Sequence, residues 1–347
     1  MASFLSRLKS AFHTHTHKAP TINDGSILTP PKVLSVESVV EGFYASLFGN
    51  GDIDAAENLS VPQKLIFEVV SRSLANTEHR LKAVPRLPAV IPRLLRTLRD
   101  NTASASDFVN IINKDPVMSA AVLRLSNSVY FNPRDKRITS IETAVVKLGI
   151  EGLRSVLSAA VMQPVIQRNS QYFSQFGQKL WEHALCCAVT AELLAKKNGL
   201  EPYLAYLLGL VHDMGKITVF SELCQQYKAN TPIQTNGQVS QPGYAAFVPL
   251  IHTMAPALSH TIARDWQLPE VICSALAEQV DIKPGRKVSA YAELLFRANY
   301  ACEIYAQIKS RDEGPSAEKR TTALRALREN SLPDTLFDTL DSLSIEV

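Results

Sequence analysis

Apolar residues recur every three or four positions along most of the chain from residue 36 onward. This spacing puts them on one face of a helix and is the main sequence signal of an amphipathic α-helix. No convincing run alternates apolar and polar residues with a period of two, so the pattern predicts an all-α fold. The best-marked helices are expected over residues 36–48, 178–197, 204–212, 269–280 and 288–308.

Capping residues mark where several helices begin and end. Ser60-Val61-Pro62-Gln63 has the form of a capping box, and Asp115-Pro116 supplies an N-cap followed by proline at the first helical position. Thr139-Ser140-Ile141-Glu142 is a second capping box, and Gly149 is expected to end the short helix that it starts. The next apolar helix, over residues 156–162, is expected to stop before Pro164.

Three irregular segments lie outside this helical pattern. Residues 1–35 are predicted to be flexible, although residues 2–12 are amphipathic and could dock on a partner or a membrane surface. The alternating histidines of residues 13–17 can capture a metal adventitiously. Residues 229–243 form a long irregular stretch directly after the central helices, and a tolerated insertion is favoured over a lid.

Composition limits the class of protein. The chain has 347 residues, 46% of them hydrophobic, and a net charge of +3, which gives no general attraction to nucleic acid or to membranes. Five cysteines without CxxC spacing are typical of reduced core thiols in a cytosolic protein. No apolar run is long enough to span a bilayer, and the N-terminus lacks the apolar region of a signal peptide. We therefore expect a cytoplasmic protein with no transmembrane segment.

An adjacent His-Asp pair closes an apolar helix near the middle of the chain. His212 and Asp213 lie in Gly209-Leu210-Val211-His212-Asp213-Met214-Gly215-Lys216, and His183 lies 29 residues upstream in another helical segment. An imidazole beside a carboxylate can bind a metal or form a buried ion pair. Lys216, one turn further along, could instead pair with Asp213 in a polar network that needs no metal.

Three further stretches carry a family resemblance. They read IINKDPVMSAAVLRLSNSVYFN at 111–132, LLGLVHDMGK at 207–216 and ARDWQLPEVICSAL at 263–276. In this order they resemble the HDOD family, the HD-related output domains of bacterial signalling. The resemblance implies a two-lobed helical domain over residues 81–300, with a first lobe over 85–165 and an HD-like lobe over 178–300. Residues 36–80 would then be a helical N-terminal extension, and residues 301–347 a helical C-terminal tail.

The same resemblance implies a set of metal ligands. His183 matches the first histidine of an HD site, and His212 and Asp213 match the pair. The fourth ligand of related proteins is an aspartate after an alanine on a late helix, and Glu293 occupies that place here. These residues could hold one Zn, Mn or Fe ion, with Lys216 in support.

The second metal of related phosphodiesterases lacks its ligands in this sequence. The histidines that the resemblance would require fall on Ala255, Gln279 and Val280. His252 lies three residues from the first of these, on roughly the same helical face, and could substitute for it. Without a second ion, an attacking hydroxide loses half of its activation.

Three functions remain as hypotheses from the sequence. The favoured one is a non-catalytic signal-transduction module with a degenerate HD metal site, acting through contacts with a signalling protein. The alternatives are a metal-dependent phosphohydrolase acting on a nucleotide and a nucleotide-binding sensor that retains the pocket without the reaction. No feature indicates a specific nucleic-acid partner, and the site is expected to hold either no cofactor or one divalent ion.

Overall fold

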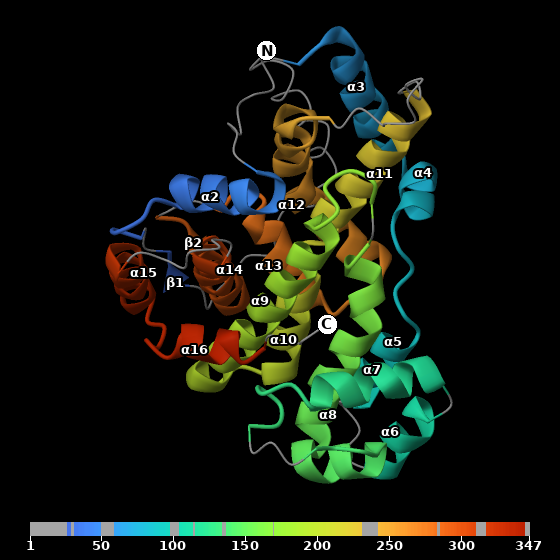
Figure 1. The fold of residues 1–347 in the computed structure, drawn as a ribbon, viewed down its shortest axis with the longest axis vertical. Coiled ribbons are helices and arrows are strands. Elements are labelled where there is room, and N and C mark those ends of the chain that lie inside the picture. The colour runs from blue at the N-terminus through green and yellow to red at the C-terminus, as the bar shows by residue number, and fades with distance from the viewer. Residues whose placement is uncertain are drawn as a thin grey trace.

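The described part of the protein is predominantly helical, as the sequence pattern predicts (Figure 1). The computed structural model describes residues 26–28, 31–49, 59–97, 104–113, 115–133, 137–168, 170–230, 242–282, 285–309 and 317–343. Figure 1 shows two lobes stacked along the longest axis, with α8 and α9 side by side where the lobes meet. The amphipathic residues 2–12, the histidines of 13–17 and most of the 229–243 stretch lie outside the described residues.

The N-terminal extension is tied to the second lobe by polar contacts. Helix α2 (Val36–Phe48) begins at the N-cap Ser35, whose side chain accepts a hydrogen bond from the Ser38 backbone. It packs along α14 (Ala290–Lys309), where the Gln307 side chain donates to the Val39 carbonyl at 2.8 Å.

Helix α3 (Val61–Ala75) has the predicted capping box at Ser60. Helix α4 (Thr77–Ala83) follows it directly along the chain.

The first lobe contains α5 (Val90–Thr97), α6 (Ala105–Ile112), α7 (Pro116–Ser126) and α8 (Ile141–Ile166). Asp115 caps α7 as predicted, because its carboxylate accepts from two backbone N–H groups of the first turn. Gly149, with φ of 66°, kinks α8 at the position where the sequence predicted an end. The expected stop before Pro164 was wrong, since α8 continues through that residue to Ile166.

The second lobe is built around two pairs of closely packed helices. Helix α9 (Phe176–Asn198) packs against α10 (Pro202–Val211), and α11 (Met214–Asn230) against α12 (Val248–Asp265). Glycines permit both contacts, because a Cβ on Gly209 would lie 2.6 Å from the Cys187 carbonyl oxygen and one on Gly215 would clash with the Ala255 backbone. A 3-10 turn (Tyr244–Ala246), α13 (Glu270–Gln279) and α14 complete the lobe.

The C-terminal part lies against the second lobe. It contains α15 (Ala317–Glu329) and α16 (Leu336–Asp341), and the latter is anchored by a hydrogen bond from the Tyr305 hydroxyl to Asp341. A small antiparallel pairing of β1 (Ser26–Ile27) with β2 (Lys287–Val288) was not predicted. Among the described residues, no helix is long and apolar enough to cross a membrane.

Candidate functional site

The His-Asp pair lies at the junction of two buried helices. Helix α10 ends at Val211, His212 is its C-cap, and α11 starts at Met214. Helix α10 is apolar and the first two turns of α11 are buried, so packing around the junction buries the two polar side chains. His212 and Asp213 are therefore more than nine-tenths buried.

Two histidines from different helices meet at this junction. The rings of His183, on α9, and His212 have centroids 5.4 Å apart. His212 Nδ1 lies 2.7 Å from the Gly209 carbonyl oxygen, which fixes that nitrogen as the donor and leaves Nε2 without a proton in the neutral ring. The Nε2 atoms of His183 and His212 lie 3.0 and 3.2 Å from Oδ1 of Asn299.

Asp213 lies at the centre of the cluster. One carboxylate oxygen is 3.5 Å from His183 Nε2, and the other is 3.4 Å from His212 Nε2. The shortest contact is with the Lys216 ammonium, at 2.8 Å. His183, His212, Asp213 and Lys216, all selected from the sequence, thus converge in space.

Burial and charge set the protonation states in this cluster. Burial lowers the pKa of His183 to about 3 and also lowers that of His212. Burial alone would raise the pKa of Asp213, but His212 and Lys216 bring it down to about 2. Burial alone would lower the pKa of Lys216, and Asp213 raises it above its usual value. Near neutral pH the cluster therefore contains two neutral imidazoles and one buried ion pair.

Asn299 and Glu303 were missed by the sequence analysis. They lie one turn apart on α14, and the Asn299 amide donates to Glu303 at 3.1 Å. Burial raises the pKa of Glu303 to about 7, against a lowering by Lys216. The sequence signal for them was the spacing of Asn299 and Glu303 at i and i+4 among the apolar residues of α14.

Glu293, predicted as the fourth ligand, makes its contacts elsewhere. It forms an ion pair with Arg297 and accepts a hydrogen bond from Ser26 of β1. Asn299, six residues further along α14, instead touches both histidines. Residues six positions apart lie on different faces of a helix. Glu293, chosen from its order in the sequence, therefore lies on a face of α14 that does not point toward the histidines.

Cys187 is a third donor that the sequence analysis assigned only to the core. It follows His183 by one helical turn, and its sulfur lies 3.5 Å from His183 Nε2. Donor atoms of His183, Cys187 and His212 all lie within 4.8 Å of one another, close enough for one ion. However, burial raises the pKa of Cys187 well above its usual value, so the sulfur is a neutral thiol. The spacing fits one ion, and binding it would require Cys187 to lose its proton and Asp213 to give up its contact with Lys216.

Two aromatic residues of the N-terminal extension close one side of the cluster. The Phe43 ring lies 4.4 Å from the His183 ring, centroid to centroid. The Lys216 ammonium lies 4.9 Å from the centre of Phe43 and 5.8 Å from that of Tyr44. Helix α2 thus contributes part of the wall of the site.

A cavity of about 280 Å³ opens beside the cluster. His252, the substitute ligand considered from the sequence, is an exposed side chain on its wall and contacts the Tyr44 ring edge-on at 5.6 Å. The three positions that lack histidine, Ala255, Gln279 and Val280, also line the cavity. Gln279 donates a hydrogen bond to the Ala292 carbonyl at 2.9 Å.

The helical fold and the buried His-Asp cluster together define an HD-type protein. The family model of the HDOD domain matches residues 84–282, more than half of the chain, and the chain belongs to the HDOD family. Helix α2 and the α14 residues Asn299 and Glu303, which complete the cluster, lie outside the matched region.

Solved structures share this fold at low sequence identity. A protein from Shewanella amazonensis, whose name proposes a metal-dependent phosphohydrolase, has a TM-score of 0.56 and 19% identity, covering 82% of this chain and 98% of that one. An HDOD domain protein of unknown function from Geobacter sulfurreducens has a TM-score of 0.53 and 21% identity, covering 82% and 99%. At such identities the likeness establishes the fold alone.

Proposed function

We propose that this protein is a signalling module that acts through protein contacts and that its HD cluster is a structural polar network without catalysis. The observation that carries the proposal is the ion pair between Lys216 and Asp213, at 2.8 Å. A metal ion would need that carboxylate, and the ammonium already neutralises it in the buried interior.

Most of the remaining polar groups of the cluster have a hydrogen-bonding partner within the protein, and the unprotonated Nε2 of His212 is the exception. His212 donates to a backbone carbonyl, Asn299 contacts both imidazoles, and Glu303 accepts from Asn299. Buried polar groups persist when they are hydrogen-bonded, because an unmet group costs free energy on folding. Such a network can hold the α10–α11 junction in place without chemistry.

The residues at the positions expected to bind a second ion support the same proposal. Ala255 and Val280 have no ligand atom in their side chains, and Gln279 is engaged with a backbone carbonyl. Two-metal hydrolysis needs ions on both sides of the attacking oxygen. At these three positions a binuclear mechanism has no ligand for its second ion, which leaves His252 on the cavity wall as the nearby imidazole.

An exposed apolar stripe on α3 supports action through protein contacts. Val61, Leu65 and Val69 follow one another at helical spacing and are 71%, 57% and 47% exposed. Apolar residues grouped on a surface are typical of interaction sites. The stripe lies outside residues 84–282, which match the family model. A partner that binds the stripe would therefore be specific to this chain rather than common to the family.

The test is a hydrolysis assay on the purified protein. Bis-p-nitrophenyl phosphate and cyclic dinucleotides would be supplied with Mn²⁺, Fe²⁺ or Zn²⁺ added separately. We expect no turnover above the metal-only blank. Turnover on the order of 1 s⁻¹ that disappears in His212→Ala, but survives in the control Glu293→Gln, would overturn the proposal.

A metal-dependent phosphohydrolase is the second candidate, favoured by the 4.8 Å grouping of His183, Cys187 and His212. A nucleotide sensor is a third, favoured by the cavity of about 280 Å³ beside Lys216. Metal analysis of the purified protein discriminates the second candidate, because an enzyme of this kind would retain close to one ion per chain. Nucleotide binding that is lost in Lys216→Met would favour the third.

A further inference from the structure

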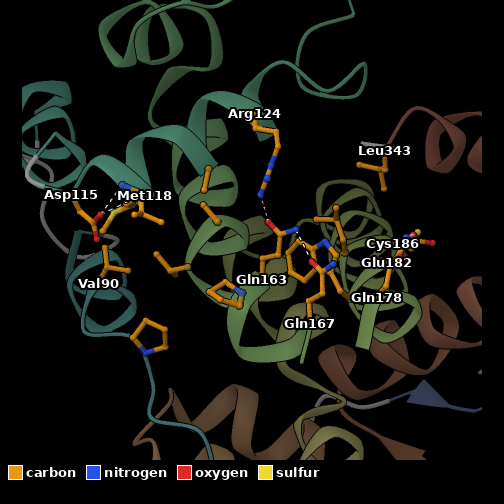
Figure 2. A pocket seen from close by; sticks show the side chains of 18 of the residues that line it. Val90, Asp115, Met118, Arg124, Gln163, Gln167, Gln178, Glu182, Cys186 and Leu343 are labelled. Carbon is orange, nitrogen blue, oxygen red and sulfur yellow. Dashed lines mark hydrogen bonds between the residues drawn. The ribbon is translucent and has the colours of Figure 1, made fainter. Parts of the chain in front are cut away.

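A larger cavity, of about 940 Å³, lies between the two lobes and away from the His-Asp cluster. One wall comes from α5, α7 and α8 of the first lobe, and the other from α9, α14 and the α16 region. Figure 2 shows Val90 and Met118 on one side of it and Glu182, Cys186 and Leu343 on the other. Ligand-sized pockets in proteins occupy about 300–1,000 Å³ and often form where lobes meet.

Most of the cavity wall is apolar. Trp181 and Leu185 contribute from α9, Met118 and Ala160 from α7 and α8, and Leu340 and Leu343 from the C-terminal part. Met118 is half-buried, and the neighbouring Val117 is 79% exposed, so apolar surface on α7 remains uncovered by protein. Burying that surface against an apolar ligand would be favourable.

A ladder of polar side chains crosses this apolar wall. The Arg124 guanidinium donates to Gln163 Oε1 at 2.8 Å, and the Gln163 amide donates to Gln167 Oε1 at 2.9 Å. Figure 2 shows Arg124 reaching from α7 toward these two side chains. Arg124 has five N–H donors in a planar fork, so most of them are available to an incoming acceptor.

Arg124 has no carboxylate partner in the part of the chain that the structure describes. No carboxylate of the described residues lies within 4.0 Å of its guanidinium, and its recorded partner is a neutral amide. The two acids on the cavity wall are already engaged. Asp115 caps α7 through Val117 and Met118, and Glu182 accepts from Gln178 at 3.1 Å. An anion in the cavity would therefore meet Arg124 without competition from these acids.

The backbone of α8 adds an acceptor at the same wall. Pro164 lies inside α8 and has no N–H to donate to the Ala160 carbonyl one turn earlier. The Ala160 carbonyl therefore lacks the usual N–H partner four residues further along the helix. Ala160 and Pro164 both line the cavity.

We propose that the interlobe cavity binds a small aromatic anion, a flat ring system carrying one acidic group. The ring lies against Met118 and Trp181, and the acidic group accepts from Arg124. The wall includes residues of both lobes and of the C-terminal part, so the ligand contacts all three. Lys309, Leu340 and Leu343 lie beyond the residues that match the family model. None of His183, His212, Asp213 and Lys216 lines this cavity, so the inference goes beyond the proposed function and does not rest on it.

The test uses 8-anilinonaphthalene-1-sulfonate, a fluorescent aromatic monoanion, beside N-phenyl-1-naphthylamine, which has the same ring system without the sulfonate. We expect saturable binding of the sulfonate at one site per chain. Arg124→Gln should weaken it about tenfold, the typical effect of losing one charge-assisted hydrogen bond, and leave the neutral probe unchanged. Ala121→Trp, which fills the cavity, should weaken both probes.

Arg72→Gln, an exposed arginine on α3, is the matched control and should bind both probes as the wild type does. Thermal melts establish that each variant is folded, and the exposed Arg124 can be changed without disturbing the core. Displacement of the sulfonate by adenosine monophosphate would assign a nucleotide as the ligand, and displacement by indole-3-carboxylate an aromatic carboxylate. Failure of both to displace it, or equal probe binding by wild type, Arg124→Gln and Ala121→Trp, would overturn the proposal.

Discussion

The ammonium of Lys216 lies 2.8 Å from a carboxylate oxygen of Asp213, with both side chains about nine-tenths buried. The two residues are one turn apart at the start of α11. A buried ion pair of this kind is costly to break, because either partner left alone keeps an uncompensated charge. In the function proposed above, this ion pair stabilises the cluster without a metal ion.

Lys216→Met should reduce the free energy of unfolding by about 3–5 kcal/mol, because it strands the Asp213 carboxylate in the interior. Urea denaturation at neutral pH measures the change. Lys82→Met is the control, since Lys82 pairs with Glu78 at 2.7 Å but its side chain is 71% exposed, and it should cost less than about 1 kcal/mol. Equal losses in the two variants would contradict the buried ion pair.

His212→Ala should destabilise the protein by about 1–4 kcal/mol, since it removes a hydrogen bond to the Gly209 carbonyl and leaves a small cavity. Denaturant unfolding gives the value. Glu293→Gln is the control, because Glu293 pairs with Arg297 and lies outside the cluster. An unchanged unfolding midpoint in His212→Ala would show that the ring contributes nothing to the junction.

His183 and Glu303 should make opposite contributions to the pH dependence of the free energy of unfolding. The pKa of His183 is lowered to about 3, so the unfolded chain binds its proton first and stability is lost as pH falls below about 6.5. The pKa of Glu303 is raised to about 7, so the folded chain holds its proton longer and stability falls as pH rises from about 4.5 to 7.

Glu303→Gln removes only the second contribution. Between pH 4.5 and 7 the variant should therefore gain stability relative to the wild type, by up to about 3 kcal/mol for a pKa raised to about 7. Urea midpoints at several pH values measure the difference. A difference that does not change with pH would show that Glu303 is charged throughout.

Gly215→Ala should cost about 1–3 kcal/mol or more, because the new Cβ would clash with the Ala255 backbone where α11 crosses α12. Gly243→Ala is the matched control, since nothing lies within 4 Å of its Cβ position. Calorimetric melting of both variants gives the comparison. Similar melting temperatures would contradict the close packing of these two helices.

Local sequence signals predicted the helices well, and tertiary contacts explain what they missed. The caps at Ser60 and Asp115 and the kink at Gly149 depend on neighbouring residues alone, so the sequence contains the information. The β1–β2 pairing has two residues per strand, too few to give a period. Helix α8 extends two residues past Pro164, where the buried side chains of Met162 and Ile166 pack on either side of the proline.

The candidate site was predicted in part for the same reason. His183, His212, Asp213 and Lys216 follow from motif and spacing, and they converge. Asn299 takes the place expected for Glu293, because the face that α14 turns inward is set by packing rather than by residue order. The contact of Phe43 with His183 joins segments 140 residues apart and has no local signal.

The most direct test of the account is the melting temperature of the wild-type protein with and without EDTA, repeated after addition of Mn²⁺ or Zn²⁺. A bound ion would add stability that a chelator removes, whereas a network closed by Lys216 gains nothing from the metal. We expect the same melting temperature under all of these conditions. A fall with EDTA that is reversed by metal, and is absent in His212→Ala, would contradict it.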